Sequence, residues 1–202
     1  IRSNLWRDRW SLVFFGFTSC PDICPLELQK LGKLLRAMEA KTGLQVIFIT
    51  VDPERDTPNK LRDYVGFFHP DIVALSGRNT ELSRTAQFFG AVYDRSVIID
   101  SKLLRVPSGI DMPDGSGDFY QVNHSTRVFI VNPGGAYSGS FMPPFDVEQL
   151  EADLNLMKRW AEPVEIAQTV AVALVAEFAG AVLGRTRGEV VQRHTQAVVD
   201  VA

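Results

Sequence analysis

The stretch Ser11–Pro25, with the sequence SLVFFGFTSCPDICP, is the part of the sequence that decides which fold we predict. Its first half, Ser11–Phe17, is a short apolar run rich in Val and Phe, which favours a buried strand. Pro21 and Pro25 exclude a continued strand, but they fit the first turn of a helix, where the backbone N–H has no partner in any case. Apolar residues then recur at helical spacing from Leu28 to Gly43. We therefore predict a strand, a turn and a helix in succession, with Asp22 as the helix cap.

The chain continues as an alternation of strands and helices as far as Trp160. We predict strands at Leu44–Val51, Ile72–Leu75, Val97–Val106, Thr126–Val131 and Ala136–Phe141. Helices are predicted at Asn59–Phe68, Thr80–Gly90 and Val147–Trp160. We also predict a loop at Pro107–Gly117 and a hairpin turn at Asn132–Gly135. Thr80 and Asp146 are the expected caps of the last two helices. This order gives an α/β fold with a mixed sheet, in which a helical crossover makes the first two strands parallel.

The composition changes at Ala161, so we expect residues 1–160 to form one domain and residues 161–202 to form a helical extension of unknown role. Ala167–Gly184 carries one charge, Glu177, and predicts a strongly apolar helix, with a second helix at Glu189–Val201. The favoured interpretation is packing on the domain or between the two helices. Formation of a homodimer is an alternative, and a membrane span is disfavoured because the segment is short and a buried charge is costly.

The bulk properties exclude several classes of protein. The net charge is −3, and no basic stripe is present, so nucleic acid is not an expected partner. Two cysteines are too few for a disulfide scaffold, and a close pair indicates redox or metal chemistry. The first ten residues contain no continuous apolar stretch and do not begin with Met, so we expect that a targeting segment is missing from this chain.

Cys20 and Cys24 stand where the first strand gives way to the first helix. A helix N-terminus stabilises a thiolate, and a spacing of four places both sulfurs on one side of a helical turn. Such a pair either closes a disulfide or chelates a soft ion such as Cu(I), whereas a structural zinc site needs four protein ligands. The alternative is a pair of buried, inert thiols, which the flanking prolines disfavour.

His124 directly precedes the predicted strand Thr126–Val131. In thioredoxin-like folds the loop that enters this strand contacts the active-site turn, so His124 is a candidate third ligand. Two thiolates and an imidazole suit Cu(I) in a trigonal site, and Cu(II) with a further ligand. A histidine that only caps the strand by hydrogen bonds remains the alternative. We expect His69 to cap a helix end and His194 to be exposed to solvent.

Four blocks of sequence resemble the Sco/SenC family. Phe15–Pro25 (FGFTSCPDICP) resembles the metal-binding signature of that family, and Val51–Pro58 (VDPERDTP), Phe68–Ile72 (FHPDI) and Val122–Ser125 (VNHS) resemble three further blocks. They occur in the family's order across about four-fifths of the chain, which makes the resemblance far more specific than one pair of cysteines.

The resemblance implies a thioredoxin-like, three-layer fold that binds one copper ion, as Cu(I) or Cu(II). The family's ligands correspond to Cys20, Cys24 and His124, with Asp22 and Asn123 beside them. Members help to load the binuclear copper site of cytochrome c oxidase, as metallochaperone, thiol reductant or both. The implied partner is therefore the copper-receiving oxidase subunit or another copper chaperone. Members are usually tethered by an N-terminal helix to the periplasmic side of the bacterial inner membrane, or to the mitochondrial inner membrane facing the intermembrane space.

Some residues depart from the family pattern. Asn123 stands where the family usually has Asp; a carboxylate there would orient the histidine or raise its basicity, and an amide carries no charge. The segment Arg95–Phe119 is longer than is typical. Within the second block, we expect Asp52 and Arg55 to pair locally and brace the site.

A thiol–disulfide oxidoreductase that uses Cys20 and Cys24 is the competing function. Three residues separate these cysteines, whereas dedicated oxidoreductases favour two. No separate motif supports a peroxidase. The sequence therefore favours a copper-binding and transfer protein over an enzyme with turnover.

Overall fold

The first apolar run of the chain forms the central strand of a five-stranded sheet in the computed structural model, which describes residues 5–38 and 43–160. All seven residues of this strand are buried, which explains why its sequence is continuously apolar. The strands are β1 Trp10–Gly16, β2 Leu44–Thr50, β3 Val73–Leu75, β4 Tyr93–Ile99, β5 Lys102–Pro107, β6 Tyr120–His124, β7 Val128–Val131 and β8 Tyr137–Phe141, and the helices are α1 Ile23–Met38, α2 Pro58–Phe68, α3 Asn79–Phe89 and α4 Val147–Trp160.

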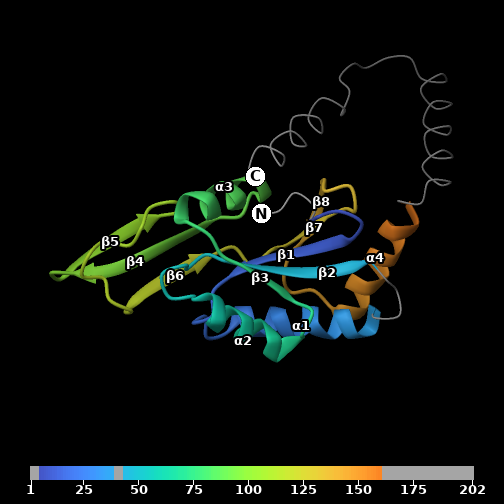
Figure 1. Cartoon of the computed structure of the whole chain (residues 1–202), viewed down its shortest axis with the longest axis horizontal. Coiled ribbons are helices and arrows are strands. Elements are labelled where there is room, and N and C mark those ends of the chain that lie inside the picture. The colour runs from blue at the N-terminus through green and yellow to red at the C-terminus, as the bar shows by residue number, and fades with distance from the viewer. Residues whose placement is uncertain (1–4, 39–42, 161–202) are drawn as a thin grey trace, which may run out of the picture.

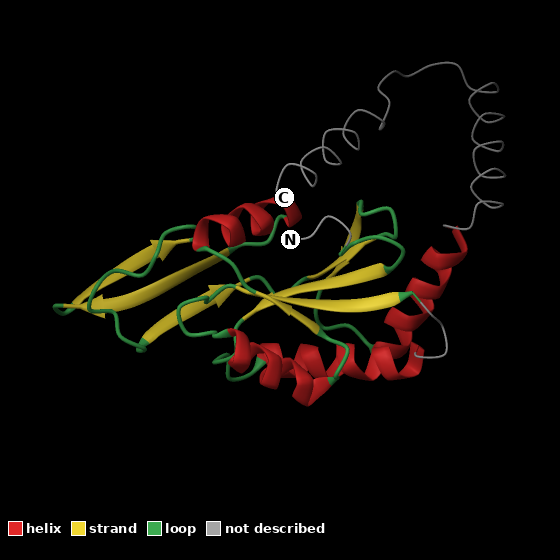
Figure 2. Ribbon diagram, in the orientation of Figure 1, coloured by secondary structure: helices red, strands yellow, loops and turns green. Residues whose placement is uncertain are grey.

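The five-stranded sheet has the order β3-β2-β1-β7-β8 and is mixed, as predicted. β1 runs parallel to β2, to which α1 connects it, and antiparallel to β7. The helices cover both faces: α1 and α2 lie on one side of the sheet and α3 on the other (Figure 1), and α4 packs against α1. The ribbon therefore shows three layers, helix, sheet and helix (Figure 2), which confirms the predicted fold class.

The two faces of β1 serve different purposes. Phe15 points toward α3, where its ring lies 5.8 Å from that of Phe89 and 5.8 Å from that of Phe129. The next residue, Gly16, lies on the opposite face against Cys24 of α1. The alternation of a strand thus places an aromatic core on one side and the start of the cysteine-bearing helix on the other.

A second sheet, with the order β5-β4-β6, projects from one end of the domain (Figure 1). The strand character predicted for Val97–Val106 is confirmed, but the stretch is divided between two antiparallel strands, β4 and β5. They are joined at Asp100 and Ser101, which have φ angles of 50° and 60°. Tight hairpin turns require such positive φ angles and usually use Gly or Asn, so the sequence carried no clear signal of this turn.

β6 is also absent from the sequence prediction. His124 was expected in a loop before a strand at Thr126–Val131, but it is the last residue of β6 and lies opposite Tyr93 of β4. The strand that follows begins only at Val128. His124 therefore belongs to the three-stranded sheet, whereas the two cysteines follow β1 of the five-stranded sheet.

The helix ends agree with the sequence in one case and differ in another. Asp146 caps α4, since its Oδ1 accepts the backbone N–H of Glu148 at 2.8 Å, as predicted. Thr80 does not cap α3; that helix begins one residue earlier, with Arg78 in the cap position and the Glu81 carboxylate accepting the Arg78 backbone N–H at 3.2 Å.

Residues 161–202 lie outside the described residues, so the helical extension and its dimerisation stay predictions. Among the helices that the structure describes, none combines the length and apolar character needed to cross a membrane.

Candidate metal centre

Three side chains far apart in the sequence converge at the N-terminus of α1. The sulfur atoms of Cys20 and Cys24 and a ring nitrogen of His124 all lie within 4.8 Å of one another. In the described part of the chain this is the one group of three such donors that are close enough to share an ion. The structure thus brings together the three residues that the sequence predicted as ligands.

Cys24 lies in the first turn of α1 and is fully buried. It packs on the backbone of Gly16: a Cβ atom at position 16 would stand 2.7 Å from the Cys24 sulfur and 2.8 Å from the ring of Phe48. Contacts this short do not occur between real atoms, so only glycine leaves room for the sulfur. No local pattern indicates this role for Gly16, the glycine of the FGF triplet.

Cys20 lies just before α1 and is partly exposed. Its sulfur accepts the backbone N–H of Cys24 at 3.5 Å. The hydrogen bond from the Cys24 side chain lowers the pKa of Cys20 to about 3, and bonds from His124 and from the backbone N–H of Asp22 act in the same direction, against the effect of burial. The pKa of Cys24 is raised far above its ordinary value by the hydrogen bond to Cys20 and by burial. The pair therefore holds a thiolate at the accessible sulfur and a thiol at the buried one.

The imidazole of His124 is oriented by its own strand end and by two aromatic rings. Nδ1 lies 3.0 Å from the backbone carbonyl oxygen of Ser125. A carbonyl oxygen can only accept, so Nδ1 is the nitrogen that carries hydrogen in this bond, and Nε2 is left facing the Cys24 sulfur at 3.4 Å. The rings of Phe17 and Phe14 meet the imidazole edge-on, with centroids at 5.7 and 6.2 Å. Nε2 thus faces the sulfurs: it donates to the Cys20 thiolate when the ring is protonated, and in the neutral ring it presents a lone pair that a metal ion could use.

Asn123 and Asp22 were expected beside the ligands. The Asn123 amide donates to the Asp94 carboxylate at 2.8 Å, and among the contacts of the described residues it is the Ser125 carbonyl that meets the imidazole Nδ1. Successive residues of a strand point to opposite faces, so a side chain at position 123 is poorly placed to reach the ring of His124. Asp22 acts through its backbone N–H on Cys20.

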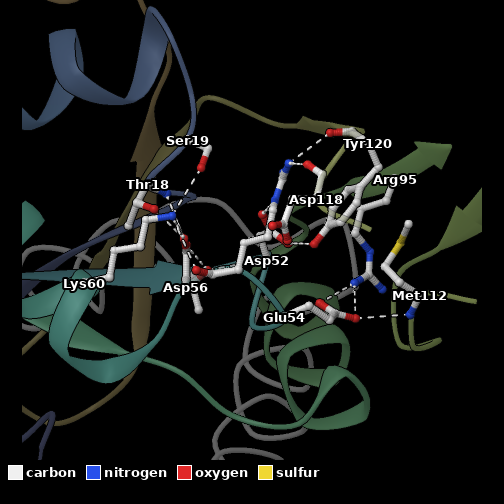
Figure 3. A network of polar contacts seen from close by, with 12 residues as sticks. Thr18, Ser19, Asp52, Glu54, Asp56, Lys60, Arg95, Met112, Asp118 and Tyr120 are labelled. Atoms are coloured by element: carbon white, nitrogen blue, oxygen red, sulfur yellow. Dashed lines mark hydrogen bonds and ion pairs between the residues drawn. The ribbon is translucent and has the colours of Figure 1, made fainter. Parts of the chain in front are cut away.

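The turn after β2 fixes the cysteine-bearing loop through Asp56 (Figure 3). The buried carboxylate of Asp56 accepts the backbone N–H of Thr18 at 3.1 Å and its hydroxyl at 2.5 Å. It also accepts the hydroxyl of Thr50 at 2.6 Å. Because Thr18 is two residues before Cys20, these bonds set the path by which the chain reaches the metal donors.

The same turn holds the predicted pair of Asp52 and Arg55. Arg55 Nε donates to Asp52 Oδ2 at 2.6 Å, which confirms the local pairing. Asp52 is fully buried and also accepts the hydroxyl of Tyr120. Burial raises the pKa of Asp52, and the hydrogen bonds from Tyr120 and Arg55 oppose that rise.

The turn also holds a second ion pair, which was not predicted from the sequence. Arg95 of β4 is fully buried and donates to both carboxylate oxygens of Glu54, at 2.6 and 2.7 Å. Glu54 also accepts the side chain of Asn79 at 2.8 Å. Burial alone would raise the pKa of Glu54, but the Asn79 bond and the charge of Arg95 hold it below its ordinary value. A single arginine within a predicted strand gave no indication of its partner.

Comparison with known proteins points to one family. A model of the SCO1/SenC family matches residues 1–159. The chain is 34% identical over 148 residues to the human "Protein SCO2 homolog, mitochondrial", which covers 72% of this chain and 50% of that protein. It is 33% identical over 147 residues to a "Putative copper-binding protein" of Stutzerimonas stutzeri, covering 72% of this chain and 64% of the relative. The chain therefore spans about half the length of the human relative.

A solved structure has the same fold. The structure of Arabidopsis thaliana ScoI with copper bound superimposes with a TM-score of 0.63 at 28% sequence identity, covering 78% of this chain and 88% of the other. The thioredoxin-like architecture predicted from the sequence is thus shared with a protein crystallised with copper.

Proposed function

Because the chain belongs to the SCO1/SenC family, we propose that it binds one copper ion through Cys20, Cys24 and His124 and passes it on during the assembly of cytochrome c oxidase. The observation that carries the proposal is the convergence of the three donor atoms within 4.8 Å of one another. The copper bound to the Arabidopsis neighbour and the printed name of the Stutzerimonas relative support copper as the ion.

The donor set has the chemistry that copper requires. Two thiolates and an imidazole are soft and borderline ligands, which suit Cu(I) in a trigonal site, whereas Cu(II) needs a further ligand. The buried Cys24 is protonated when no ion is present, so binding releases its proton. Cys20 is the accessible sulfur; a receiving protein therefore approaches from the Cys20 side, and its thiolates displace the ligands one at a time.

The proposed partner is the copper-receiving subunit of cytochrome c oxidase or another copper chaperone. The proposed location is the mitochondrial inner membrane, facing the intermembrane space, or the periplasmic side of the bacterial inner membrane. The human relative carries the word mitochondrial in its name, and the Stutzerimonas relative is bacterial.

The unequal acidity of the two thiols favours a second function, that of a thiol–disulfide reductant. The Cys20 thiolate would attack a disulfide of the partner and release one partner thiolate. Cys24 would then lose its proton and attack the Cys20 sulfur, which forms the Cys20–Cys24 disulfide and releases the second partner thiol. The partner is reduced by two electrons, and the pair is oxidised by two.

The test of the copper proposal is an anaerobic titration of the reduced protein with Cu(I) and Cu(II), followed by optical absorption and EPR. We expect one equivalent of Cu(II) with a thiolate-to-copper charge-transfer band. Cys20→Ser, Cys24→Ser and His124→Ala should each remove that band, and His194→Ala serves as the histidine control.

The two functions separate at His124. If the chain is a copper carrier, His124→Ala sharply weakens Cu(II) binding and leaves disulfide formation nearly intact. If it is a reductant, the same change alters the rate of reduction, and the wild type reduces insulin at a rate comparable to thioredoxin. A wild-type protein without stoichiometric binding of either copper ion would rule out the copper proposal.

A further inference from the structure

The three candidate donors belong to two different sheets. Cys20 and Cys24 lie between β1 and α1, at the end of the central strand of the five-stranded sheet, whereas His124 ends β6 of the three-stranded sheet. No ladder of backbone hydrogen bonds joins the two sheets among the described strands. Residues 125–127 join β6 to β7 of the five-stranded sheet, so the distance between the histidine and the cysteines depends on this short connection and on the side chains that hold β6 in place.

Arg55 makes several such contacts, next to the hydrogen bond from the Tyr120 hydroxyl to Asp52. Its Nη1 donates to the backbone carbonyl oxygens of Asp118 and Tyr120, at 3.0 and 3.1 Å, where the chain enters β6. Its Nε donates to Asp52, the buried carboxylate at the end of β2. One guanidinium thus ties the strand that carries His124 to the turn that follows β2 of the five-stranded sheet. Hydrogen bonds from a charged donor are among the stronger ones in proteins.

The same guanidinium also bridges two aromatic rings. Its carbon lies 3.8 Å from the centre of the Tyr120 ring and 5.8 Å from that of Phe17. Phe17 is in turn the ring that meets His124 edge-on at 5.7 Å. Stacking of this kind adds an attraction that depends on the planar, charged shape of arginine. Arg55 is therefore linked to the imidazole both through the β6 backbone and through Phe17.

The other end of the turn acts on the cysteine side. Asp56, the next residue, holds Thr18 in the loop that leads to Cys20. The turn after β2 consequently contacts both halves of the candidate site, and Arg55 is its contact with the histidine half.

We propose that Arg55 is a positioning residue, which holds β6 against the five-stranded sheet and so keeps His124 within bonding reach of Cys20 and Cys24. Only the test that uses copper rests on the proposed function. The position of the imidazole in the metal-free protein tests it independently.

The metal-free test is NMR of the histidine ring protons in the reduced protein. The chain contains three histidines, and the His124 signals are assigned by their loss in His124→Ala. In Arg55→Met we expect these signals to move toward those of an exposed histidine, because the imidazole loses its fixed place between the aromatic rings. Arg55→Lys should behave similarly, since an amine keeps the charge but cannot hold the carboxylate and both carbonyls at once. Arg36→Met is the matched control, because Arg36 also donates to a carbonyl, that of Phe68 at 3.0 Å, in a different part of the fold.

The copper test is a double-mutant cycle with His124→Ala. We expect Arg55→Met to weaken Cu(II) binding by about 10- to 100-fold, the usual loss when a residue behind a metal ligand is removed. In the His124→Ala background the same change should cost nothing further, because Arg55 acts through the histidine. Thermal unfolding of every variant shows separately how much stability is lost.

Two results would overturn the proposal. One is an unchanged set of His124 signals in Arg55→Met and Arg55→Lys, and the other is an equal loss of copper affinity with and without His124. If the wild type binds no copper, the proposed function fails and the NMR result alone decides the role of Arg55. If Arg55→Met does not fold, Arg55→Lys carries both tests.

Discussion

Gly16→Ala tests whether the packing of Cys24 depends on a missing side chain. The new methyl would stand 2.7 Å from the Cys24 sulfur and 2.8 Å from the Phe48 ring. Both distances are about 1 Å short of the optimal separation of non-bonded atoms. Phe48 is fully buried in the core and Cys24 is held in the first turn of α1, so neither atom can give way freely. The substitution should displace the Cys24 sulfur from His124 Nε2.

The cost follows from two opposing effects. Overpacking a buried site costs about 1–3 kcal/mol, while replacing glycine in a strand returns about 0.5–1 kcal/mol of backbone entropy. The net loss is on the order of 1–2 kcal/mol. For a domain of this size, 1 kcal/mol shifts Tm by about 2–4 °C, so Gly16→Ala should lower Tm by about 2–8 °C.

Thermal unfolding of the reduced protein measures this loss, and a Cu(II) titration measures the effect on the site. Gly66→Ala is the control, because Gly66 lies in α2 and a Cβ atom there meets nothing within 4 Å. That variant should raise Tm by about 1–4 °C through the entropy gain alone. A Gly16→Ala protein that melts as high as Gly66→Ala, with an unchanged copper spectrum, would refute the reasoning.

The remaining predictions concern the acidity of Cys20 and the anchoring carboxylate of Asp56. Because the pKa of Cys20 lies at about 3, its alkylation by iodoacetamide should stay nearly constant between about pH 8 and about pH 5; a rate that falls tenfold per pH unit there, as for an ordinary thiol, would contradict this. The folded-state pKa of Cys20 is below the ordinary value of 9.0, so its contribution to the free energy of unfolding should be complete above that value and lost as the pH falls toward about 3. In urea titrations at several pH values, Cys20→Ser should therefore show a weaker dependence of the free energy of unfolding on pH. Asp56→Asn keeps one acceptor oxygen for the three hydrogen bonds that the carboxylate receives from Thr18 and Thr50, so it should cost about 2–4 kcal/mol in urea unfolding. The exposed Asp63→Asn should stay within about 0.5 kcal/mol, and equal midpoints for the two variants would argue against an anchoring role.

Local sequence patterns predicted the main sheet and its helices because each element carries its own signal. β1 is continuously apolar and buried on both faces, and the leucines of α1 recur at helical spacing. Asp146 occupies a cap position that its residue type favours. In each of these cases the information lies within a few residues of the element itself.

The projecting sheet was less predictable because its signals are distant or atypical. The hairpin between β4 and β5 turns on Asp100 and Ser101 rather than on glycine. β6 begins after a loop rich in Gly and Pro, and its exposed face is polar. Its place in the fold depends on contacts with a turn more than 60 residues earlier, at Asp52 and Arg55. No local pattern can encode a partner at that separation.

The three donors were foreseen as a set, but their surroundings were not. Residue type and the resemblance to one family indicated two cysteines and a histidine. The glycine that leaves room for one sulfur and the carbonyl of Ser125 that orients the imidazole are backbone features. A side-chain pattern does not reveal such features, and this is why the expectation for Asn123 differs from the contact that it makes.

The division of the donors between two sheets has a thermodynamic consequence. An ion held by all three donors would act as a cross-link between two sheets that no ladder of backbone hydrogen bonds joins among the described strands. Its binding free energy would then add to the free energy of separating the two sheets and leave the separation of strands within each sheet unaffected. A partner that binds better when the smaller sheet is displaced would lower the affinity for the ion. By reciprocity, the bound ion would lower the affinity for that partner by the same factor. Release of the ion and displacement of the smaller sheet would thus be thermodynamically linked, so that each favours the other.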